Sequence, residues 1–131
     1  MTTLFLLLDL EGRKTFDPEK VRTCLQAENV YNWRGQDQHR LFECHFDFDG
    51  DSTIFALASD RRSANIDGMG PASIELALRL QRCYGEEIHA MDDEFVADIR
   101  LSGVASVAEF EEKLSAAYRA LKAGQDTPIT M

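Results

Sequence analysis

Apolar and polar side chains alternate along residues 41–48, and the alternation resumes along residues 51–58. Such alternation is typical of a strand with one buried face. Between the two runs, Asp49-Gly50 supplies the positive φ angles that a two-residue hairpin turn requires. The resulting register turns one set of side chains toward the core: Phe42, Cys44, Phe46, Phe55 and Leu57. The opposite face of the hairpin then carries Glu43, His45, Asp47, Ser52, Ile54 and Ala56.

Three other segments have apolar residues at helical spacing and suitable end signals. Asp17-Pro18 is an N-cap followed by a first-turn proline, and Ser106 with Glu109 forms a capping box. Glycines follow the second and third segments, as they commonly follow helices. We therefore expect helices from Pro18 to about Asn29, from Pro71 to Tyr84, and from Val107 to Gly124.

Short apolar runs predict the remaining strands, over residues 4–10, 64–66, 88–91 and 95–101. Residues 30–40 are ambiguous: Tyr31 and Trp33 fit a short strand, whereas residues 35–38 resemble a loop. The order of elements predicts an α+β fold, with a mostly antiparallel sheet and helices packed on one face. It indicates a ferredoxin-like order with an added C-terminal helix. We expect a single domain over residues 1–124 and a flexible tail over residues 125–131.

Composition and charge narrow the function classes. With 44% hydrophobic and 28% charged residues, the chain resembles an ordinary folded domain. Its net charge of −9 disfavours nucleic acids and anionic membranes as partners. A basic protein, a cation or a neutral small molecule is compatible with this charge, which otherwise serves only to keep the protein soluble. No apolar stretch has the length of a membrane span.

Three cysteines, Cys24, Cys44 and Cys83, are too few and too widely spaced for a disulfide framework. Each lies among apolar neighbours. We therefore expect reduced, buried cysteines and a cytoplasmic location.

One cluster could support chemistry. Glu43, His45 and Asp47 share a strand face, and a histidine between two carboxylates can carry protons. Cys44 points to the other face and cannot act with it as a nucleophile. Alternation alone already predicts polar residues on the outer face of a sheet, so we predict no catalytic activity from them.

Residues 47–51 resemble the start of a calcium loop, but Gly50 and Ala58 stand where such a loop needs other residues. The hairpin turn accounts for the acidic residues, and neither a metal nor a cofactor is predicted.

Two acidic segments remain. One is Glu43 to Asp51 in the hairpin, and the other is a tract that contains Glu86, Glu87, Asp92, Asp93, Glu94 and Asp98. A partner-binding surface is predicted to include Asp47, Asp51, Ile54, Asp92, Asp93 and Glu94. Trp33 would join it if exposed, although a core position is favoured for tryptophan.

Three function classes follow. The first is an acidic module that binds a basic protein, of the immunity, inhibitor or adaptor type. The alternative is a small enzyme or small-ligand-binding domain that uses the face with Glu43, His45 and Asp47. The third is a subunit that forms a homodimer through an uncovered sheet face.

Overall fold

The structure is a computed structural model that describes residues 3–35, 37–93 and 97–126, with side chains up to residue 122. Its strands are β1 (Thr3–Leu7), β2 (Tyr31–Arg34), β3 (Arg40–Phe48), β4 (Asp51–Ala58), β5 (Ser63–Asp67), β6 (His89–Met91) and β7 (Asp98–Arg100). Its helices are α1 (Pro18–Gln26), α2 (Pro71–Tyr84) and α3 (Val107–Asp126), with a 3-10 turn at Leu101–Gly103.

The predicted hairpin is confirmed residue by residue. β3 and β4 pair Phe46 with Thr53 and Cys44 with Phe55, as the two-residue turn requires. Asp49 and Gly50 have φ angles of 53° and 75°, so both occupy the left-handed region. The local turn therefore sets which side chains of this hairpin are buried.

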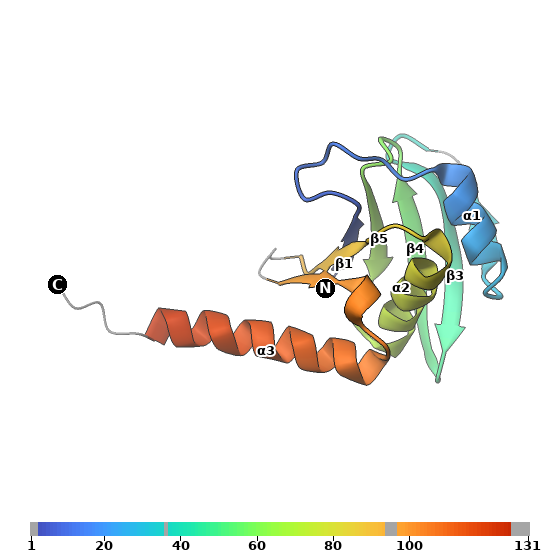
Figure 1. Cartoon of the computed structure of the whole chain (residues 1–131). Helices are drawn as coiled ribbons and strands as arrows, with labels where there is room; N and C mark the ends of the chain where they lie inside the picture. The colour runs from blue at the N-terminus through green and yellow to red at the C-terminus, as the bar shows by residue number, and fades with distance from the viewer. Residues whose placement is uncertain (1–2, 36, 94–96, 127–131) are drawn as a thin grey trace.

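The seven strands form one antiparallel sheet with the order β2-β3-β4-β5-β1-β6-β7 (Figure 1). The α+β class is confirmed, whereas the ferredoxin-like order is wrong. After α1 the chain starts a new edge at β2 and returns to β1 through three hairpins. β1 consequently lies between β5 and β6 in a sheet of seven strands, whereas a ferredoxin-like fold has four.

Helices α1 and α2 cover one face of the sheet (Figure 1). The N-cap predicted at Asp17 is present, since its carboxylate accepts from the N–H groups of Glu19 and Lys20. The backbone N–H of Asp17 donates to the buried Tyr84 hydroxyl at 2.9 Å, which ties the start of α1 to the end of α2. The helices and the sheet enclose one cluster of buried apolar side chains. We call the opposite side of the sheet the uncovered face; it bears Glu43, His45, Ile54, Ala56, Asn65 and Asp67.

The expectation of reduced cysteines is wrong for two of the three. Cys24 of α1 and Cys83 of α2 form a disulfide across a sequence separation of 59 residues. Their spacing in the sequence carries no sign of this pairing, because only the packing of α1 against α2 brings them together.

The third cysteine, Cys44, is a free thiol in the core. Burial, and secondarily the charge of Glu43, raises the pKa of this thiol to about 12. Because the thiolate is the reactive form, we expect Ellman's reagent to find no reactive thiol in the native oxidised protein. Denaturation should expose one thiol, and denaturation with reduction should expose three. A thiol that reacts rapidly in the native state would contradict this arrangement.

The C-terminal elements differ from expectation at their boundaries. The strand predicted over residues 95–101 is described only as β7, since Phe95 and Val96 lie outside the described residues and Leu101 begins a 3-10 turn. The backbone N–H of Leu101 still donates to the Ile88 carbonyl at 2.9 Å. Helix α3 does not stop at Gly124 and continues to Asp126. Of the tail predicted over residues 125–131, residues 127–131 lie outside the described part.

Candidate functional site

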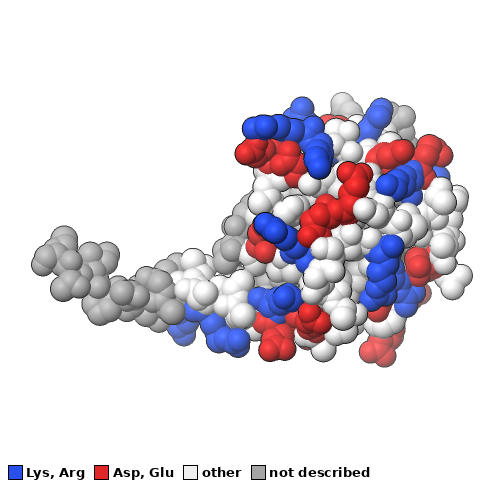
Figure 2. Space-filling view, in the orientation of Figure 1, with Lys and Arg blue, Asp and Glu red and all other residues white. Residues whose placement is uncertain are grey.

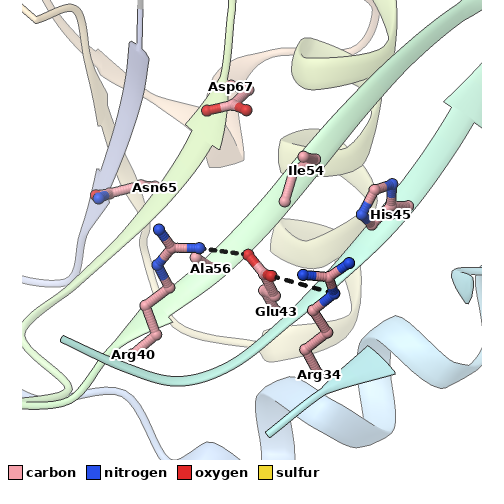
Figure 3. A pocket seen from close by; sticks show the side chains of 8 residues that line it. All are labelled: Arg34, Arg40, Glu43, His45, Ile54, Ala56, Asn65 and Asp67. Atoms are coloured by element: carbon pink, nitrogen blue, oxygen red, sulfur yellow. Dashed lines mark hydrogen bonds and ion pairs between the residues drawn. The ribbon is translucent and has the colours of Figure 1, made fainter. Parts of the chain in front are cut away.

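A hollow of about 390 Å³ opens on the uncovered face of the sheet (Figure 3). Its floor is formed by Ile54 and Ala56 of β4, which alternate with the buried Phe55. The flanking strands supply its polar walls. All of the lining residues come from strands β2 to β5: Arg34, Arg40, Glu43, His45, Ile54, Ala56, Asn65 and Asp67.

Glu43 lies between two arginines on one side of the hollow (Figure 3). Its Oε2 atom is 2.5 Å from Nη1 of Arg40, and its Oε1 atom is 3.8 Å from Nε of Arg34. The side chain of Glu43 is only 12% exposed, while those of Arg34 and Arg40 are 67% and 49% exposed. The carboxylate is therefore held in place, whereas both guanidinium groups retain free donors for an incoming ligand.

Asp67 and Asn65 form the opposite wall, across the floor from Glu43 (Figure 3). The backbone carbonyl of Asp67 accepts from the hydroxyls of Thr53 at 2.7 Å and Ser73 at 2.5 Å, which anchors this end of β5. Within the described residues its carboxylate has no hydrogen-bond or ion-pair partner. The hollow thus has a cationic side and an anionic side, separated by an apolar floor.

Of the three residues predicted for proton chemistry, Glu43 and His45 line the hollow and Asp47 does not. The Nε2 atom of His45 is 3.3 Å from the side-chain nitrogen of Asn32. Tyr31 donates its hydroxyl to Asp47 at 2.8 Å, and its ring lies 5.5 Å from that of His45. Asp47 is therefore held beside the hollow by Tyr31.

Hydrogen bonds from Tyr31 and then Ser52 hold the pKa of Asp47 below its ordinary value. The same bond raises the pKa of Tyr31. Asp47 consequently stays ionised and does not serve as an acid near neutral pH. No serine, threonine, cysteine or lysine is among the described lining residues; the titratable groups of the hollow are two carboxylates, one imidazole and two guanidinium groups.

The structure uses two of the predicted partner-binding carboxylates internally. Asp51 accepts the N–H of Ala72 at 3.1 Å and so caps the start of α2. A Cβ atom at Gly70 would lie 2.5 Å from Oδ2 of Asp51, so a larger residue there would displace this capping carboxylate. Asp92 is buried and accepts from the N–H of Ala97 and the hydroxyl of Tyr118.

The remaining predicted partner residues are dispersed. Ile54 is part of the floor of the hollow, while Asp93 is exposed beyond β6. Strands β5 and β1 separate the acidic end of the β3–β4 hairpin from β6. Glu94 lies outside the described residues. The two acidic segments therefore do not merge into one patch in the described part of the molecule.

Edge strand β2 is the short strand that the sequence left open at Tyr31 and Trp33, and it exposes both aromatic side chains. Tyr31 and Trp33 are 44% and 38% exposed, so the core position favoured for Trp33 is wrong. Trp33 packs against Phe42 with ring centroids 5.6 Å apart. A second hollow of about 260 Å³ lies beside it, lined by Arg22, Gln26, Trp33, Arg34, Gly35 and Phe42. Arg34 thus lines both hollows and connects the edge to the uncovered face.

The described residues contain no group of three or more His, Cys, Asp or Glu side chains placed to hold a metal ion. Among the helices of the described part, none combines the length and apolar character needed to cross a membrane. No protein-family model matches the chain, and neither the curated proteins nor the solved structures include a significant match.

Proposed function

We propose that the chain is a protein-binding module that takes a partner on edge strand β2 and the adjoining uncovered face of the sheet. The observation that carries this proposal is the grouping of Tyr31, Trp33 and Arg34 on one exposed strand beside two hollows. Tyrosine, tryptophan and arginine are the residues that most often dominate the binding energy of protein interfaces. Tryptophan stabilises a fold best when it is buried, so its exposure on a sheet edge favours a role in binding.

The partner is proposed to be basic. The net charge of −9 creates a field that attracts a positively charged protein and raises its association rate. Figure 2 shows acidic and basic side chains interspersed over the side of the molecule that faces the viewer in Figure 1. The net charge of the whole chain, rather than one acidic patch, would therefore attract the partner. Asp47, Asp93 and Asp67 are available as individual contacts.

This proposal can be tested by comparing two edges of the same sheet. The Arg34→Ala and Trp33→Ala variants should lose binding, whereas Arg100→Ala, on the opposite edge strand β7, should not. We expect at least about a tenfold loss of affinity from each variant at β2. Affinity purification from the native cells, with quantitative mass spectrometry, identifies the partner, and titration with that partner measures the loss.

Retention of the same partner by all three variants would refute the proposed surface. Trp33 also packs on Phe42, so thermal unfolding of each variant is needed to exclude a loss of fold. Arg34 is largely exposed and makes only a 3.8 Å ion pair, so its replacement should leave the melting temperature unchanged.

The hollow on the uncovered face favours a second candidate, a small-ligand-binding domain. Its volume of about 390 Å³ lies within the usual range for ligand pockets, and its two charged walls could orient a polar molecule. Binding of a small molecule that is lost in Asp67→Asn and retained in Trp33→Ala would favour this candidate. No catalytic role is proposed for either case.

The disulfide also bears on the cellular location of the protein. A cytoplasmic location remains a prediction, and the Cys24–Cys83 disulfide argues for an oxidising compartment instead, where disulfides persist. An immunity, inhibitor or adaptor role for the module is compatible with either location.

A further inference from the structure

Helix α3 extends well beyond the body of the molecule. Its 20 residues correspond to about 30 Å of helix. Near its start, Phe110 is buried, and Val107 and Leu114 pack against the core. The rest of the helix then runs away from the sheet and the other helices (Figure 1). We call residues 113–122 the arm.

The apolar side of α3 continues along the arm, and its exposure increases from Leu114, which packs against the core, to Leu121. Phe110, Leu114 and Leu121 follow helical spacing and so lie on one side of the helix. Leu121 is 43% exposed and Tyr118 is 38% exposed, although the Tyr118 hydroxyl donates to Asp92. A helical segment of about ten residues is only marginally stable in water by itself, so a contact with this side would stabilise it.

The charge of the arm is opposite to that of the rest of the chain. Residues 113–122 contain Lys113, Arg119 and Lys122 and no acidic residue, a net charge of +3. Residues 1–112 contain 11 Lys or Arg and 22 Asp or Glu, a net charge of −11. The arm and the rest of the chain therefore have net charges of opposite sign, which favours their association.

The arm contacts its own body through Leu114 and the Tyr118–Asp92 hydrogen bond, and the continuous α3 then extends beyond it (Figure 1). We propose that the arm docks on the acidic body of a second copy of the chain, in a reciprocal two-fold dimer. A two-fold arrangement gives both arms the same contact and leaves neither arm uncovered. Tyr118 and Leu121 supply apolar contact, while Lys113, Arg119 and Lys122 supply attraction to the body of the other copy.

The proposal predicts a dimer that depends on one side of the helix. Leu121→Glu places a carboxylate on the apolar side, whereas the matched Ala116→Glu places the same charge on the opposite, exposed side. Sedimentation velocity over a range of concentrations should show a dimer for the native chain. Leu121→Glu should raise its dissociation constant at least about tenfold more than Ala116→Glu does.

The electrostatic attraction between the arm and the other copy is tested with a separate variant and by cross-linking. Arg119→Glu combined with Lys122→Glu should also convert the dimer to a monomer, and higher salt should weaken the native dimer. Zero-length carbodiimide cross-linking of a mixture of ¹⁴N and ¹⁵N chains should join Lys113 or Lys122 of one copy to body carboxylates of the other. Circular dichroism of each variant checks that the body remains folded.

Three results would overturn the proposal. The first is a native chain that stays monomeric at every concentration. The second is a dimer that Leu121→Glu and Ala116→Glu affect equally. The third is a dimer in which neither lysine of the arm cross-links between copies. This dimer and the proposed partner surface at β2 are tested by different variants, so either can fail without the other.

Discussion

Removal of the Cys24–Cys83 disulfide should lower the free energy of unfolding by about 4 kcal/mol. The cross-link joins residues separated by 59 positions, so it restricts a large part of the unfolded chain. In the chain-entropy account, the stabilisation grows slowly with the size of the closed loop, from about 3 kcal/mol for 15 residues to about 4.7 kcal/mol for 100 residues. Total stabilities of domains are commonly about 5–15 kcal/mol, so this change is a large fraction.

Urea unfolding with and without a reductant measures the effect. Oxidised native protein should unfold at a clearly higher urea concentration than reduced protein or the Cys24→Ser/Cys83→Ser variant. The variant should not respond to the reductant, because its remaining Cys44 is a free thiol. Equal midpoints for the oxidised and reduced native protein would show that the disulfide does not form or does not stabilise the fold.

The second large effect is expected at the centre of the sheet. Phe55→Ala should lower the free energy of unfolding by about 3–5 kcal/mol. Phe55 is fully buried on β4, where its ring lies 6.4 Å from that of Phe42. Its removal leaves a cavity between the sheet and the helices that the rigid strands cannot close.

The neighbouring Ile54→Ala is the matched control. Ile54 points to the opposite side of the same strand and lies in the floor of the open hollow, so its truncation should cost only about 1 kcal/mol. Urea unfolding of both variants compares them under the same conditions. If Ile54→Ala proved as destabilising as Phe55→Ala, the inward and outward faces of β4 would be wrongly assigned.

Local signals in the sequence were sufficient where the structure is decided by near neighbours. The Asp49-Gly50 turn and the alternation on either side of it predicted the register of the β3–β4 hairpin correctly. Asp17 and Gly85, which flank α1 and α2 respectively, also act as predicted. In each case the contacts that decide the local structure join residues close together in the chain. Once a turn or cap is fixed, the regular spacing of side chains decides which of them are buried.

The predictions that differ from the structure share a different cause. The sequence leaves strand β2 open because Tyr31 and Trp33 give too short a pattern to decide it. All four of its residues are exposed, and pairing with β3 makes it a strand. The predicted strand order was wrong because long-range pairing of strands decides that the chain passes from α1 to a new edge of the sheet. The helix α3 continues through Gly124, where the isolated glycine signal predicted its end.

The candidate site divides in the same way. Glu43, His45 and Ile54 were placed on one outward face from the sequence, because a single hairpin relates them. Arg34 and Asp67 reach the same hollow from β2 and β5, and their positions depend on how those strands join the sheet. The sequence predicted Asp51 and Asp92 as partner-binding residues, yet their carboxylates accept hydrogen bonds from distant segments of the chain.

The sequence alone determined the class of the fold, the inward face of the central hairpin and the strongly acidic character of the chain. Only the tertiary structure decided the order of the strands, the Cys24–Cys83 bond, the two-walled hollow and the exposure of Trp33. Turns, caps and side-chain alternation are set by contacts between near neighbours. The contacts between α1, α2 and the outer strands join residues far apart in the chain, and no local pattern encodes those distances.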